Sequence, residues 1–159
     1  MSASIFRFFA ISTASLVFSA AAAEAPPSSP TPSAPSSAGD RTANLQKFFA
    51  RYHCAKPYPI LDYLRIADHY QLDYRVLPAI SIRETGCGKS GGPLNNLWGF
   101  HQQSFPSLAA GIEFLAHRLT QHKLYREKTL DQKLFTYNPR SAYPGEVVRI
   151  MRQIDDAMR

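Results

Sequence analysis

The stretch YRVLPAISIRETGCG, residues 74–88, carries the pattern that decides the fold. Leu77, Ile80 and Glu84 stand at i, i+3 and i+7, which predicts a helix that ends where two glycines follow. The same spacing places the Glu84 carboxyl on the apolar face of that helix. Desolvation there disfavours the ionised form, and so does the partial negative charge of a helix C-terminus.

Helical periodicity recurs on both sides of this stretch. Glycine, proline and asparagine replace it over residues 87–105, which predicts a loop. No run of residues is typical of a strand, and no internal repeat is present. The expected class is therefore all-α, or α-rich α+β at most. The predicted helices cover residues 45–52, 60–70, 74–85, 107–122, 125–134 and 143–158.

The N-terminal region is expected to direct export. Residues 1–23 are typical of a signal peptide, because Arg7 is the only charge before Glu24 and an apolar run ends in small residues. An uncleaved membrane anchor is the alternative, although a span needs about 20 strongly apolar residues. Residues 24–40 are rich in proline and serine and predict a disordered linker. The folded domain is then 41–159, in the periplasm or secreted.

The two cysteines, Cys54 and Cys87, predict a disulfide, since an even number in an exported chain favours pairing. Closing a loop of about 33 residues contributes roughly 3 kcal/mol. Two unpaired buried thiols are the alternative. Formation of the bond would tie an early helix to the turn just after Glu84.

The chain carries a formal net charge of +6, and its lysines and arginines are scattered rather than clustered. Scattered charge argues against nucleic acid as a partner. A basic exported domain instead fits an anionic cell-wall matrix. We expect a monomer that is not inserted in the membrane after signal cleavage.

The loop segment Asn95-Asn96-Leu97-Trp98-Gly99-Phe100 offers groups suited to sugar binding. The amides of Asn95 and Asn96 can bind hydroxyl and N-acetyl groups, and Trp98 and Phe100 can stack on pyranose rings. Taken alone, these two aromatics are more often part of a core.

Residues 83–90 and 95–100 together resemble the glucosaminidase-type members of the lysozyme superfamily. Those proteins carry a Glu-Ser-Gly-x-Gly-Lys-Ser stretch followed by Asn-Asn-Leu-Phe-Gly-Ile. The resemblance implies a lysozyme-like helical domain with Glu84 as general acid and the β-1,4 glycan of peptidoglycan as substrate. It also implies that Tyr143, and Tyr137 as a second candidate, line the cleft. The segments that extend it over most of residues 74–155 are Phe105-Pro106-Ser107-Leu108, Tyr137-Asn138-Pro139 and Tyr143-Pro144-Gly145-Glu146-Val147.

The chain departs from that family between Phe100 and Phe105, where similar proteins insert a β-hairpin lobe that can carry a second carboxylate. Only residues 101–104 stand there, and no Asp or Glu occurs from Thr85 to Ile112. We therefore expect a reduced or missing β-lobe. The routes left to catalysis are participation by the N-acetyl group of the substrate or a water held by amides; the remaining possibility is no catalysis.

Other motifs lack their structural context. Residues 86–91 match the Gly-x-Gly-x-x-Gly dinucleotide fingerprint, but they follow a predicted helix rather than a strand and open no helix. The five histidines show no i, i+4 pair, so no metal site is expected. No cofactor is expected either.

Three functions remain as hypotheses. The first is an exported peptidoglycan hydrolase of N-acetylglucosaminidase type with Glu84 as acid. The second is a lytic transglycosylase that uses the same acid. The third is a catalytically silent module for wall binding or assembly. A separate alternative for Glu84 itself is a structural residue paired with Arg83 or Lys89.

Overall fold

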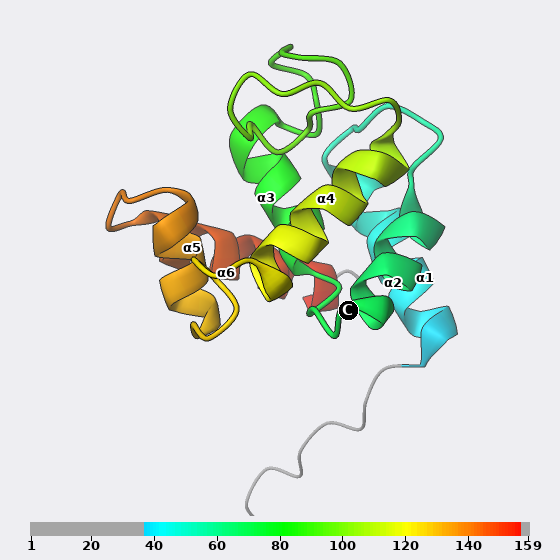
Figure 1. The fold of residues 1–159 in the computed structure, drawn as a ribbon. Helices are drawn as coiled ribbons and strands as arrows, with labels where there is room; N and C mark the ends of the chain where they lie inside the picture. Colours follow the sequence, from blue (N-terminus) through cyan, green and yellow to red (C-terminus); the bar gives the residue numbers. More distant parts are fainter. Residues whose placement is uncertain (1–36, 157–159) are drawn as a thin grey trace, which may run out of the picture. The chain divides into compact units, whose positions relative to one another are not determined.

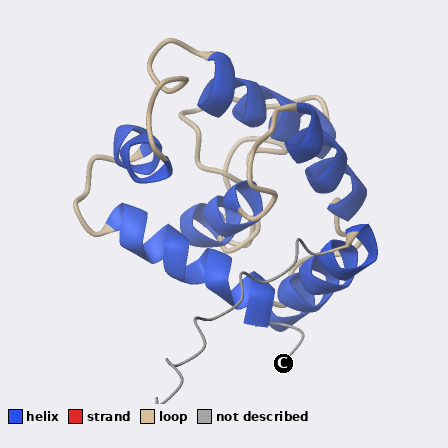
Figure 2. Cartoon of the chain, turned by 90° about the horizontal axis from the view of Figure 1, so that it is seen from below, coloured by secondary structure: helices blue, strands red, loops and turns tan. Residues whose placement is uncertain are grey.

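A computed structural model of the chain describes residues 37–156, which form six helices (Figure 1). No strand occurs in this part of the chain (Figure 2), so the predicted all-α class is confirmed. The expected signal peptide and most of the expected linker lie outside the described residues. The helices are α1 (Ala38–Arg51), α2 (Ile60–His69), α3 (Val76–Thr85), α4 (Leu108–Gln121), α5 (Leu130–Tyr137) and α6 (Tyr143–Asp155).

The first helix begins inside the stretch expected to be a linker. Ser37 caps α1, because its hydroxyl accepts a hydrogen bond from the Asp40 amide at 3.2 Å. The Asp40 carboxylate in turn accepts one from the Ser37 amide at 3.1 Å, which completes a capping box. Residues 38–40, which were expected to belong to the linker, are therefore helical.

Capping also shifts α5. The expected helix over 125–134 begins at Leu130, because Thr129 and Gln132 form a second capping box, and it continues to Tyr137. Turns occupy the residues just before Thr129. None of the helices within residues 37–156 is long and apolar enough to cross a membrane.

Helix α3 is the centre of the packing. Every residue from Val76 to Ser81 is buried, so this part of the helix has no polar face. It packs against α6 and α4, whose apolar faces cover it (Figure 1). Complete burial of one large aliphatic side chain contributes about 1.5–3 kcal/mol. The fully buried members of this core include Leu45, Phe48, Tyr63, Ile66, Ile80, Ile112, Val147 and Ile154.

The predicted disulfide between Cys54 and Cys87 is present. It joins the segment after α1 to the turn after α3, and the Lys89 ammonium reinforces that junction by donating to the Tyr52 carbonyl at 2.6 Å. The turn that follows Glu84 is thereby fixed to a distant part of the chain.

Candidate active site around Glu84

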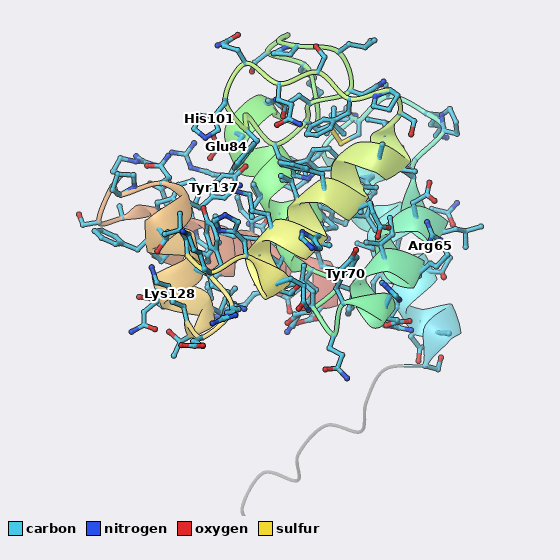
Figure 3. All side chains as sticks on the ribbon, in the orientation of Figure 1. Arg65, Tyr70, Glu84, His101, Lys128 and Tyr137 are labelled. Atoms are coloured by element: carbon cyan, nitrogen blue, oxygen red, sulfur yellow. A yellow bond between two sulfur atoms is a disulfide. The ribbon has the colours of Figure 1, made fainter. Side chains whose placement is uncertain are left out.

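Glu84 lies in the last turn of α3 and is partly buried. Its Oε1 atom is buried and has no hydrogen-bond partner among residues 37–156. The next residue, Thr85, anchors the loop: its hydroxyl donates to the Leu97 carbonyl at 2.6 Å and accepts from the Gly88 amide at 2.8 Å. Glu84 therefore sits where the central helix meets the loop that contains the sugar-binding candidates (Figure 3).

The backbone of Gly99 packs directly against Glu84. A Cβ atom at Gly99 would stand 3.1 Å from Glu84 Oε2 and 3.3 Å from Glu84 Cβ. Gly99 also has φ +62°, a conformation that side chains disfavour. Gly99 belongs to the loop motif, but no role was predicted for it from the sequence. The only sequence feature that pointed to a role was its position directly after Trp98.

Two tyrosines stand beside the carboxyl group. Tyr143 opens α6 and is fully buried, and burial raises the pKa of its hydroxyl, which the neighbouring Glu84 carboxylate raises further. The Tyr143 hydroxyl makes no hydrogen bond of ordinary geometry within the described residues, so the two groups are neighbours rather than a firm pair. Burial, followed by the charge of Glu84, also raises the pKa of Tyr137.

The tyrosine rings support each other and the loop. They stack with centroids 6.2 Å apart, and the Tyr137 hydroxyl donates to the Trp98 carbonyl at 2.6 Å. With raised pKa values, both hydroxyls remain protonated at neutral pH. The structure thus brings Tyr137 and Tyr143, predicted from separate segments, to the same carboxyl group.

The partners that would make Glu84 a structural residue are occupied elsewhere. Arg83 pairs with Glu146, and its guanidinium lies 5.9 Å from the centroid of the Tyr143 ring. Arg140 also pairs with Glu146. The hydrogen bond from Arg83 is the main cause of the lowered pKa of Glu146, which therefore stays ionised. Since Lys89 donates to a backbone carbonyl, neither of the expected partners pairs with Glu84.

The two asparagines hold the loop instead of facing a ligand. Asn96 is 4% exposed; its Nδ2 donates to the carbonyls of Phe100 and Gln103, and its Oδ1 accepts from the Phe100 amide. The expectation that Asn96 binds sugar is therefore not supported, because its hydrogen-bonding groups are engaged within the loop. Asn95 donates through Nδ2 to the Phe105 carbonyl at 2.9 Å, which crosses the base of the same loop.

The aromatic pair is also internal. Trp98 is 0% exposed, and its Nε1 donates to the Leu77 carbonyl of α3 at 3.0 Å. Phe100 is 8% exposed, with its ring packed against Phe114 and Tyr137. Neither ring is available for stacking on a sugar, so these two expectations are corrected: both aromatics fix the loop to the helices.

An open groove of about 1200 Å³ lies elsewhere, between α1, the α1–α2 connection and the start of α4. Of the residues predicted for sugar binding, Asn95 lines it, and Glu84 does not. Its walls are mostly apolar and include Pro57, Tyr58, Pro59, Ile60, Leu61, Pro106 and Leu108.

No cluster of three His, Cys, Asp or Glu side chains that would hold a metal occurs between residues 37 and 156. No protein-family model, curated protein or solved structure matches the chain. The motif residues quoted above therefore remain the basis of the family resemblance, and the geometry around Glu84 is independent of it.

Proposed function

We propose that this protein is a peptidoglycan hydrolase that cleaves a β-1,4 glycosidic bond with Glu84 as the general acid. The observation that carries the proposal is the Glu84 carboxyl itself, which has one oxygen buried without a partner beside two tyrosine hydroxyls. A glycosidase needs a carboxyl group that gives a proton to the leaving oxygen of the sugar bond, and the Glu84 carboxyl is not engaged in an ion pair with Arg83 or Lys89.

Glu84 would protonate the leaving oxygen of the sugar bond while the bond from C1 breaks. A second carboxylate for the other face of the sugar is not evident: Glu146 is held by Arg83 and Arg140. A water held by the Asn96 amide is also disfavoured, because that amide is fully engaged in the loop.

The substrate itself then supplies the missing group. The carbonyl oxygen of its N-acetyl substituent bonds to C1 as the leaving sugar departs, and a water molecule later opens that ring. The water gives its proton to Glu84 and so restores the acid. This route needs one protein carboxyl group and accounts for a site built around a single glutamate.

The site of action is proposed to be outside the cytoplasm. Disulfides such as Cys54–Cys87 persist in oxidising compartments, and the N-terminal sequence is typical of an exported chain. The net positive charge favours association with an anionic wall polymer, and added salt should weaken that association.

A digest of purified cell wall tests the proposal. The unmutated chain is expected to release muropeptides, and Glu84→Gln to release none while its helical circular dichroism is unchanged. Glu127→Gln is the matched control, because Glu127 is exposed and its ion pair is with the neighbouring Arg126. If the unmutated chain releases no muropeptides, the proposed hydrolase activity is refuted.

Two other functions give different results in the same digest. A lytic transglycosylase needs an acid but no hydrolytic water, so the lack of an evident second carboxylate also favours it; its products end in anhydro sugars by mass spectrometry. A silent wall-binding module, favoured by the burial of Trp98 and Phe100, would sediment with wall fragments and release nothing.

A further inference from the structure

Arg118 differs from the other partly buried arginines. Among residues 37–156, four arginines are partly buried, and three of them have a carboxylate partner. Arg41 pairs with Asp68, Arg75 with Asp73 and Asp155, and Arg83 with Glu146. Arg118 makes no hydrogen bond or ion pair with any described residue. Guanidinium groups removed from water normally require such a partner.

The position of Arg118 is fixed by an aromatic ring. Its Cζ atom lies 5.0 Å from the centroid of Phe100, and its Nε is buried without an acceptor. The terminal nitrogens have no partner among the described residues either, and they are not completely buried. The base of the group is therefore held in place, while its planar fork keeps some contact with solvent.

The surroundings of Arg118 are basic. No Asp or Glu occurs between Phe114 and Arg126, whereas His117, His122 and Lys123 lie in this stretch. Burial lowers the pKa of His122, and the positive charge of Arg118 lowers it further. The acid just before this stretch, Glu113, accepts a hydrogen bond from the Tyr70 hydroxyl at 2.6 Å. No carboxylate of α4 is thus left to neutralise Arg118.

Phe100 connects Arg118 to the candidate active site. The same ring packs against Tyr137 at a centroid distance of 6.0 Å, and Phe100 directly follows the glycine that touches Glu84. Arg118 therefore stands one aromatic side chain away from the tyrosines that flank the acid. A sugar polymer bound across Glu84 would extend over this region.

We propose that Arg118 binds a carboxylate of the glycan substrate next to the bond that Glu84 cleaves. This inference rests on the proposed function and adds a requirement for an acidic ligand. A planar carboxylate fits the two terminal nitrogens of a guanidinium, and partial burial limits the screening of the pair by solvent. In peptidoglycan the carboxylate belongs either to the acidic sugar or to the peptide attached to it.

Binding titrations with the full chain test the assignment. Glu84→Gln is the background, so that no ligand is consumed, and three ligands of equal length are used: peptide-free strands, peptide-bearing strands and neutral chitin oligosaccharides. Arg118→Gln is expected to raise the dissociation constant about tenfold for a carboxylate ligand and to leave chitin binding unchanged. Weakening with peptide-free strands assigns the carboxylate to the sugar; weakening only with peptide-bearing strands assigns it to the peptide.

Arg65→Gln is the matched control, because it removes the same charge from an exposed position on α2, on the opposite side of the view in Figure 3 from Glu84 and Tyr137. Equal weakening by both substitutions, or equal weakening by Arg118→Gln for neutral and acidic ligands, overturns the proposal. Should Arg118→Gln not fold, Arg118→Lys takes its place in the Glu84→Gln chain, because it keeps the charge and removes the planar fork. Its affinity for acidic strands must fall relative to chitin, and an unchanged ratio refutes the assignment.

Muropeptide release by the unmutated chain is scored separately. Release combined with no effect of Arg118→Gln on binding overturns the Arg118 inference and leaves the hydrolase standing. Arg118-dependent binding without any release overturns the hydrolase and supports the carboxylate site in a wall-binding module.

Discussion

Substitution of Gly99 by alanine tests how the Glu84 carboxyl is held in place. The new Cβ would stand 3.1 Å from Glu84 Oε2, closer than an ordinary contact, so the carboxyl must shift by a few tenths of an ångström. Since a misplacement of about 1 Å at a reacting group costs about 100-fold in rate, a shift of this size predicts a loss of about three- to tenfold.

Stability changes as well, and a second glycine separates the two effects. Gly99 and Gly91 have φ values of +62° and +75°, and an alanine in either conformation costs about 1–2 kcal/mol. A Cβ at Gly91 meets nothing within 4 Å, so Gly91→Ala incurs the backbone cost alone. Gly99→Ala should lower the free energy of unfolding by that amount and by a further few tenths of a kcal/mol, because of the contact with Glu84.

The assay combines urea unfolding with the initial rate of muropeptide release per folded molecule. Gly91→Ala should unfold at lower urea and keep its rate, whereas Gly99→Ala should unfold at lower urea and lose rate. Equal rates for the two folded variants would refute the argument that contact with Gly99 sets the position of the acid.

Three further predictions concern the scaffold. Trp98→Ala should cost about 3–5 kcal/mol of unfolding free energy in urea, and a variant of unchanged stability would contradict its core role. Replacing Cys54 and Cys87 by serine should lower the free energy of unfolding by about 3–4 kcal/mol relative to the oxidised chain. Reductant should then have no effect on the stability of the variant. Hydrogen bonds from arginines lower the pKa values of Asp68 and Glu146. The stabilisation of the fold by these two carboxylates is therefore present above about pH 4.5 and disappears as the pH falls. Substituting both residues by amides should make the urea midpoint less dependent on pH on the acid side.

The helices could be predicted because each buries an apolar stripe whose spacing is visible in the sequence. Their starting points were harder to predict, because side-chain caps and not apolar spacing decide them: Ser37 caps α1, which begins at Ala38, and Thr129 caps α5, which begins at Leu130. The helix was expected to start near Tyr125. This side chain is buried, but it belongs to a turn before α5. Periodicity detects burial, and burial alone does not distinguish a helix from a turn packed on the core.

The candidate site was predicted in its residue types but not in its orientation. Glu84 and the two tyrosines lie together, although they come from three separate helices. The resemblance implied that Tyr143 lines a cleft, but this side chain is fully buried. Asn96 and Trp98 point inward, which no local pattern in a loop can reveal, because a loop has no fixed periodicity. Arg118 was missed because its environment is formed by Phe100, which is distant in the sequence.

The inward orientation changes how the loop contributes to the site. The Asn96 side chain closes the loop by hydrogen bonds to the loop backbone, Trp98 attaches the loop to α3, and the Tyr137 hydroxyl donates to the Trp98 carbonyl. These three anchors surround Gly99 and fix its backbone against the carboxyl of Glu84. The amides and aromatics that suggested sugar binding therefore hold the loop, and with it the surroundings of the Glu84 carboxyl, in one position.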